Sequence, residues 1–158
     1  MDYVRKILES DEKLIYRAAV HWIVFAQAVV FLLLGGGVLA WYGIERSPSG
    51  TTFFSSALLF VGLTLIAAGV FAFFRGLIER YATELAITSR RVIAKTGFIR
   101  RHTWEINAAK VEGVEVTQSV LGRIFDYGTV TVKGTGGGTA PIRDIAKPVV
   151  FRSHVTSL

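Results

Sequence analysis

The apolar residues of this chain form two long uninterrupted blocks, followed by a stretch in which they alternate with polar ones. Residues 22–42 hold 21 positions without a charged side chain, and residues 53–74 hold 22 more. About 20 apolar residues, at 1.5 Å of rise each, cross a hydrocarbon core of about 30 Å. Trp22, Trp41 and Tyr42 stand at the ends of the first block, as aromatic residues do at membrane interfaces. The pattern predicts two transmembrane helices.

The connector between the two blocks is short and rich in turn-forming residues, including Pro48 and Gly50. Such a connector makes the two helices antiparallel neighbours in a hairpin. Glycines recur along both helices, where small side chains let membrane helices approach closely. The alternative is the ordinary glycine content of membrane helices. The glycines that we expect at the helix interface are Gly35, Gly62, Gly69 and Gly76.

Beyond residue 75 the apolar positions change to the period of a β-strand. Leu85 and Ile87, for example, alternate with polar or small neighbours. The same alternation recurs at residues 102–107, 113–117 and 129–133, with turn signals near Gly97, Gly128 and residues 134–138. Five or six short strands in about 70 residues predict a small antiparallel sandwich or barrel.

Two stretches of this region have a helical pattern instead. Residues 119–125 (SVLGRIF) predict a short helix between strands, and Pro148 occupies a plausible first position of a C-terminal helix with an apolar side. The sequence therefore predicts an N-terminal segment (1–21), a membrane α-helical hairpin (22–74) and an all-β domain (75–158). A short C-terminal helix would cap one open end of that β domain.

Several motifs are spaced along the chain. The longest is ELAITSRRVIAKTG at residues 84–97, and an acidic Asp11-Glu12-Lys13 precedes His21-Trp22 near the N-terminus. The others are VEGVEVTQSVLG at 111–122, DYGTV at 126–130 and GTGGG at 134–138. Together they resemble the bacterial membrane-anchored pleckstrin-homology-like (PH-like) domains of the YdbS-like class. The resemblance covers nearly the whole chain and implies two orthogonal antiparallel sheets capped by a C-terminal helix, but it implies little about activity.

Charge is distributed unevenly along the chain, which carries a formal net charge of +6. Residues 1–21 hold four basic and four acidic side chains, whereas residues 75–158 hold thirteen basic and seven acidic ones. The connector holds only Arg46, beside Glu45. The positive-inside rule therefore predicts that both termini lie in the cytoplasm, with the connector outside a bacterial inner membrane.

Basic side chains cluster around one predicted strand-turn-strand unit. A hairpin with its turn near Gly97 would bring the chain ends of this unit to one rim. The residues that we expect there are Arg90, Arg91, Lys95, Arg100 and Arg101. Such a patch would bind anionic lipid head groups or an acidic partner. The alternative is a solvated edge whose charges prevent pairing with other strands.

The sequence lacks the residue groups that catalysis or cofactor binding requires. Cysteine is absent, and the three histidines have no metal-ligand spacing. The glycine run at 134–138 is not followed by the Lys-Ser/Thr of a phosphate loop. We therefore expect a non-enzymatic, membrane-anchored binding or scaffold protein without a cofactor or metal. It would act through self-association, a related membrane protein or membrane lipid, and not through nucleic acid. The alternative is a subunit of a membrane export or stress-resistance complex.

Overall fold

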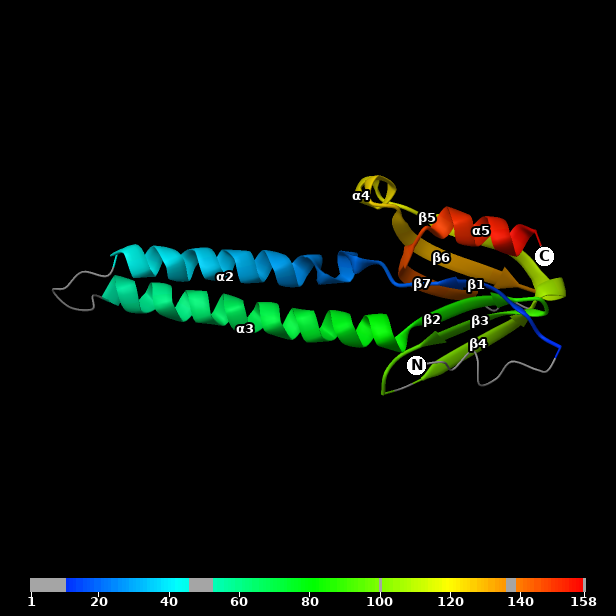
Figure 1. Cartoon of the computed structure of the whole chain (residues 1–158), viewed down its shortest axis with the longest axis horizontal. Coiled ribbons are helices and arrows are strands. Elements are labelled where there is room, and N and C mark those ends of the chain that lie inside the picture. Colours follow the sequence, from blue (N-terminus) through cyan, green and yellow to red (C-terminus); the bar gives the residue numbers. More distant parts are fainter. Residues whose placement is uncertain (1–10, 46–52, 100, 136–138, 158) are drawn as a thin grey trace. The chain divides into compact units, whose positions relative to one another are not determined.

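The computed structural model describes residues 11–45, 53–99, 101–135 and 139–157 (Figure 1). The chain forms two compact units. One comprises Val24–Leu77, and the other takes in the chain up to Ile23 and from Ile78 onward. The second unit is therefore assembled from two pieces of chain, with the hairpin inserted between them. We refer to these units as the hairpin and the PH-like unit.

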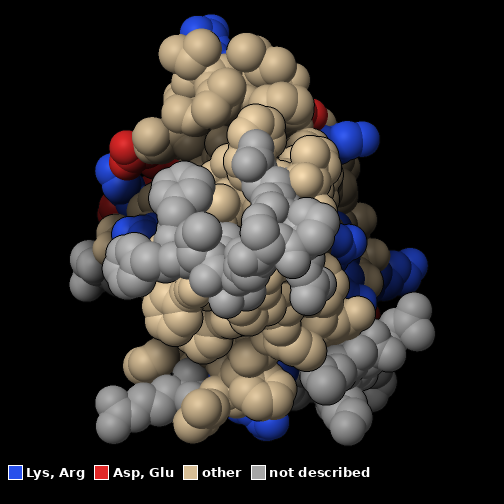
Figure 2. Space-filling view, turned by 90° about the vertical axis from the view of Figure 1, so that its left-hand side faces the viewer, with Lys and Arg blue, Asp and Glu red and all other residues tan. Residues whose placement is uncertain are grey.

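The hairpin contains two long helices. The 3-10 helix η1 (Trp22–Phe25) leads into α2 (Ala26–Glu45), and α3 (Phe53–Ala82) continues beyond its predicted end at residue 74. Two helical stretches, Trp22–Ile44 and Ser56–Ala82, are long and apolar enough to cross a membrane. Large side chains such as Leu33, Phe60 and Phe71 are exposed on them, an arrangement that suits lipid and not water. Seen from the left-hand side of Figure 1, the described surface is mostly uncharged, with charged atoms at its margin (Figure 2).

Glycines line the contact between the two helices. A side-chain carbon added at Gly69 would lie 2.8 Å from Leu32 Cγ, and one at Gly62 would lie 2.5 Å from Leu39 Cδ2. One added at Gly36 would meet no atom within 4 Å. A side-chain carbon added at either of the two other predicted glycines would also contact the opposite helical segment, at Ile66 for Gly35 and at Phe25 for Gly76. We therefore propose that these four positions stay small because the backbones approach closely there.

The PH-like unit consists of two antiparallel sheets. The four-stranded sheet has the order β1-β2-β3-β4 and the three-stranded sheet the order β5-β6-β7. The strands of the first sheet are β1 (Leu14–Ala18), β2 (Glu84–Thr88), β3 (Arg91–Thr96) and β4 (His102–Asn107). Those of the second are β5 (Val111–Thr117), β6 (Tyr127–Gly134) and β7 (Thr139–Ala146). The predicted fold class is confirmed.

Three short helices complete the PH-like unit. The 3-10 helix η2 (Ala108–Lys110) joins the two sheets, α4 (Val120–Ile124) joins β5 to β6, and α5 (Pro148–Thr156) closes the chain. Figure 1 shows α5 lying along the second sheet, where it contacts β5 and β6. Phe151 of α5 is fully buried, and its ring meets that of Tyr16 in β1 edge-on at 6.3 Å. The C-terminal helix therefore covers the core, whose largest aliphatic side chains are Leu85, Ile87, Ile93 and Ile145.

Strands β1 and β7 were not predicted. Strand β1 comes from the segment before the hairpin and pairs antiparallel with β2, placing Arg17 opposite Ala86. Strand β7 contains Pro141, which weakens a strand pattern because proline cannot donate to the ladder. Proline is tolerated here because β7 is the last strand of its sheet. A single bridge, Val20 to Ile145, links the chain just before the hairpin to β7.

Candidate functional site

The predicted basic residues do not share one rim. The register of β3 and β4 pairs Arg91 with Asn107 and Thr96 with His102. Arg91 therefore lies at the start of β3. This end of the β3–β4 pair is opposite to the turn beside Arg101. At about 3.3 Å per residue, a strand of this length separates the two ends by roughly 17 Å. The prediction of one shared rim is wrong. In this antiparallel pair, residues at the start of β3 lie beside residues at the end of β4 and not beside the turn between the two strands. Arg100 lies outside the described residues.

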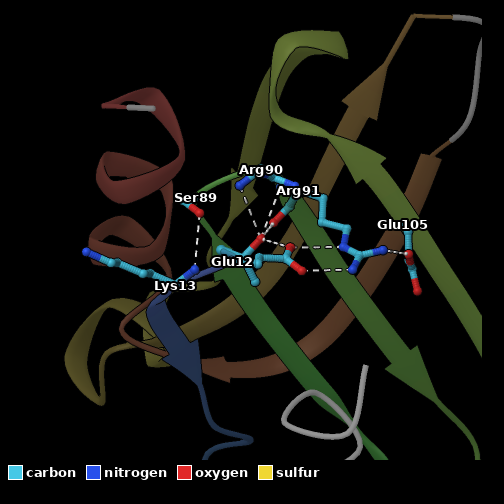
Figure 3. Close-up of polar contacts among 7 residues, drawn as sticks. Glu12, Lys13, Ser89, Arg90, Arg91 and Glu105 are labelled. Atoms are coloured by element: carbon cyan, nitrogen blue, oxygen red, sulfur yellow. Dashed lines mark hydrogen bonds and ion pairs between the residues drawn. The ribbon is translucent and has the colours of Figure 1, made fainter. Parts of the chain in front are cut away.

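Arg91 instead belongs to a partly buried ionic cluster that reaches the N-terminal segment (Figure 3). Its Nε and Nη2 donate to the two carboxylate oxygens of Glu12 at 2.9 and 2.8 Å, and its Nη1 donates to Glu105 at 2.9 Å. The Thr88 hydroxyl donates to the same Glu12 carboxylate at 2.6 Å. The Glu12 side chain is fully buried. We call Glu12, Thr88, Arg91 and Glu105 the Glu12 cluster.

The Glu12 cluster has the electrostatics of a structural contact. The hydrogen bond and the negative charge of Glu12 raise the pKa of the Arg91 guanidinium above its ordinary value. The guanidinium is held between two carboxylates, which makes it a poor ligand for a lipid phosphate. The adjoining pocket of about 400 Å³ is lined by Glu12 and Glu105 as well as by Arg90 and Arg91, so its walls carry no excess of positive charge for an anion.

Hydrogen bonds around Thr88 and Ser89 fix the turn between β2 and β3. The backbone N–H groups of Arg90 and Arg91 both donate to the Thr88 hydroxyl oxygen, at 3.4 and 3.0 Å. Ser89 N–H donates to the Lys13 carbonyl at 2.9 Å, and Lys13 N–H donates to the Ser89 hydroxyl at 3.2 Å. The turn is thereby attached to the segment that precedes β1. The motif residues Thr88 and Arg91 thus hold the N-terminal segment against the sheet.

The remaining predicted basic residues differ in exposure. Lys95 is buried, with its ammonium 3.9 Å from the buried carboxylate of Glu84, which Arg17 approaches at 3.7 Å. Arg90 is half-exposed and lies 3.9 Å from Asp11. Arg101 is exposed beside the β3–β4 turn. The predicted patch is therefore divided among separate environments.

The open edge of β4 is a better candidate for a binding surface. Among the described strands, β4 is the last of its sheet, so its outer backbone groups face away from β3. A pocket of about 300 Å³ lies beside it and is lined from β3, β4 and β7. The lining includes Ala94, His102, Thr103, Trp104, Pro141 and Ile142. An edge strand beside a pocket can pair with an extended peptide and take up one of its side chains.

His21 occupies a third distinctive position, immediately before the first span. Its ring is buried and stacks on Tyr127 at 5.3 Å, and its Nδ1 accepts a hydrogen bond from Ile23 N–H at 3.2 Å. Burial lowers the pKa of His21, although Asp126 and Asp144 act in the opposite direction. Within the part of the chain that the structure describes, no group of three or more His, Cys, Asp or Glu side chains could hold a metal.

Sequence reasoning missed both the Glu12 cluster and the β4 pocket. The cluster had a signal, because Asp11-Glu12-Lys13 and TSRR are both among the recognised motifs. A contact between them depends on β1, which was not predicted. The pocket depends on β7, which was not predicted because Pro141 interrupts its strand pattern.

Comparison with known proteins relates the chain to one family. A family model described as "Bacterial PH domain" matches residues 14–158. The UPF0699 transmembrane protein YdbT of Bacillus subtilis (strain 168) is 24% identical over 97 residues, which are 61% of this chain and 19% of that protein. The chain therefore spans about a fifth of the length of that curated relative. No solved structure matches the chain.

Proposed function

Because this chain belongs to the bacterial PH domain family, we propose that it is a binding module which two transmembrane helices hold at the bacterial cytoplasmic membrane. The module acts by binding and not by catalysis. Both termini and the PH-like unit lie on the cytoplasmic side. The excess of basic residues outside the connector supports this orientation through the positive-inside rule.

The observation that carries this proposal is the open edge of β4 with its adjoining pocket. The partner is a polypeptide that adds an extended strand to β4, with one side chain entering the pocket beside Trp104. Thr103 and Glu105 are exposed on β4 and are positioned to contact such a strand. Backbone pairing would supply affinity, and the pocket would supply selectivity.

The first partner to consider is a second copy of this chain. Two copies that pair β4 with β4 about a twofold axis would form a closed, self-complementary interface. Anchoring in one membrane would also raise the effective concentration of each copy for the other. A related membrane protein with a suitable strand is the second partner to consider. The alternative role as a subunit of an export or stress-resistance complex stays a prediction.

The absence of native cysteine allows a direct test by cross-linking. Thr103→Cys places a unique thiol on β4, and Ser153→Cys places a control thiol on the exposed side of α5. Membranes that contain each full-length variant are treated with a short bismaleimide, and the products are identified by mass. We expect a dimer of this chain, or a defined adduct with a related membrane protein, from Thr103→Cys only. Equal cross-linking at both positions, or none at either, would refute the proposal.

A further inference from the structure

The short helix α4 and the residue after it expose a cluster of large apolar side chains. Val120, Leu121, Ile124 and Phe125 are 77%, 58%, 68% and 44% exposed. The Trp22 ring, itself half-exposed, meets the Phe125 ring edge-on at 5.8 Å. All five residues belong to the PH-like unit. A contiguous exposed apolar group of this kind marks an interaction site.

The local structure holds these side chains outward. The Ser119 hydroxyl accepts a hydrogen bond from Gly122 N–H at 3.0 Å, and the Gln118 amide donates to the carbonyls of Gly122 and Tyr127 at 3.2 and 3.1 Å. A side-chain carbon at Gly122 would lie 2.6 Å from the Tyr127 carbonyl oxygen, so only glycine fits. Asp126 closes the loop in the left-handed region, at φ 57°. The exposed apolar side chains therefore sit on a defined framework.

Within the PH-like unit, α4 lies beside the residue at which the chain enters its first span. Trp22 is the first residue of the candidate span Trp22–Ile44. A tryptophan at this position lies at the membrane interface, among the lipid head groups. Phe125 of the α4 loop contacts this tryptophan, so the apolar cluster includes the residue that begins the span.

A second apolar loop lies where the other span ends. Phe98 and Ile99, in the turn between β3 and β4, are 56% and 93% exposed. Glu84 follows the end of α3 by two residues and pairs with Lys95, which is next to the last residue of β3. The turn that follows β3 is therefore at the end of the sheet where the chain leaves α3. A second exposed apolar group therefore lies at the end of the sheet where the chain leaves its second span.

Basic residues accompany both loops. Arg123 lies within α4 and Arg101 follows the β3–β4 turn, and both are exposed. An anionic leaflet attracts basic side chains held close to it. Asp126, which follows Phe125, is also exposed, so the apolar tips, with Arg101 beside one of them, are what matches the boundary between acyl chains and anionic head groups.

We propose that α4 and the β3–β4 turn form a lipid-docking surface, inserting Leu121 and Ile99 into the leaflet that the spans enter. The insertion would reach roughly 5–10 Å into the boundary between head groups and acyl chains, as for interfacial helices. The surface acts in addition to the two spans and fixes the PH-like unit against the membrane. It is separate from partner binding at β4, and its ligand is the bilayer itself.

Site-specific labelling of the full chain tests this surface. Leu121→Cys and Ile99→Cys each give a single thiol for an environment-sensitive nitrobenzoxadiazole label, and Thr156→Cys on the exposed side of α5 is the control. The proteins are placed in nanodiscs of phosphatidylcholine and phosphatidylglycerol, which leave both leaflets accessible. Quenching is then compared between lipids with a shallow nitroxide group and iodide in the water.

Labels at positions 121 and 99 are expected to be quenched by the nitroxide lipids and protected from iodide, with the reverse pattern at position 156. Iodide quenching at 121 and 99 equal to that at 156 would show that the loops stay in water. A blue-shifted emission without lipid quenching would show that protein covers them. Either result would overturn the proposal. Because these side chains are exposed, the label does not disturb the core, and an unchanged melting midpoint verifies this for each variant.

Discussion

Replacing Arg91 by methionine removes the two hydrogen bonds that its guanidinium donates to the buried carboxylate of Glu12. The bond from the Thr88 hydroxyl is kept. Removing one partner of a buried ion pair costs about 3–5 kcal/mol, because the other charge stays buried without its counter-charge. We expect a cost near the lower limit, about 3 kcal/mol, because the Arg91 side chain is 23% exposed and water can partly replace it.

The loss should be concentrated where the Glu12 cluster acts. Glu12 lies two residues before β1, so the variant should release β1 from β2 more readily than it unfolds the rest of the sheet. A loss of about 3 kcal/mol corresponds to a roughly 100-fold higher population of the locally open state, and hydrogen exchange in β1 accelerates accordingly. Hydrogen exchange followed by mass spectrometry, on peptides that contain Arg17 and Ala18, measures this opening in the detergent-solubilised protein.

Glu105→Gln is the matched control for this measurement. It removes the exposed arm of the cluster and keeps both bonds between Arg91 and Glu12. A partly exposed ion pair contributes only about 0–1 kcal/mol, so exchange in β1 should change by less than roughly fivefold. Equal exchange rates in β1 for Arg91→Met and the unaltered protein would refute the structural role of the cluster. Equal effects of the two substitutions would refute the ranking of its bonds.

Two further predictions concern the hairpin and the residue before it. Gly69→Leu should force the helices apart, cost about 1–3 kcal/mol of stability and lower the melting midpoint of the solubilised protein. Gly36→Leu should leave the midpoint unchanged, and equal midpoints for the two variants would contradict the close packing at Gly69. Burial lowers the pKa of His21 from 6.5, so the folded state favours the neutral ring. The stability that the neutral His21 ring contributes should be complete above about pH 6.5 and should decline as the pH falls below that value. Melting curves between about pH 7 and pH 5 should show this decline, and His21→Asn should reduce it; an unaltered decline would assign it to other groups.

The hairpin and most of the sheets were predictable because their patterns are local. A charge-free block long enough to cross a membrane has few other stable solutions, and residues 102–107 show the strand period directly. Pro148 marks the start of α5 because its ring suits the first turn of a helix. In each case the residues that specify the element lie within it.

The misplaced basic patch had a different cause. The position of Arg91 depends on which residues of β3 and β4 pair, and a shift of register alters every neighbour. Its partner Glu12 lies 79 positions away in the chain and joins it through β1. An alternation pattern contains no information on such pairing. The sequence therefore indicated which residues are charged but not which of them neutralise one another.

The insertion of the hairpin between β1 and β2 also determines the order in which the protein can be made. Strand β1 leaves the ribosome first, but its partner β2 follows only after both spans have been synthesised. The 65 residues between Ala18 and Glu84 take roughly 3–13 s to translate at 5–20 residues per second. During that time β1 has no strand to pair with, while α2 and α3 enter the bilayer. A chain in which only one span crosses the bilayer holds β1 and β2 on opposite sides, and β2 with Leu85 and Ile87 then stays open to proteases and chaperones. Completion of the four-stranded sheet thus requires that both ends of the hairpin lie on one side of the membrane.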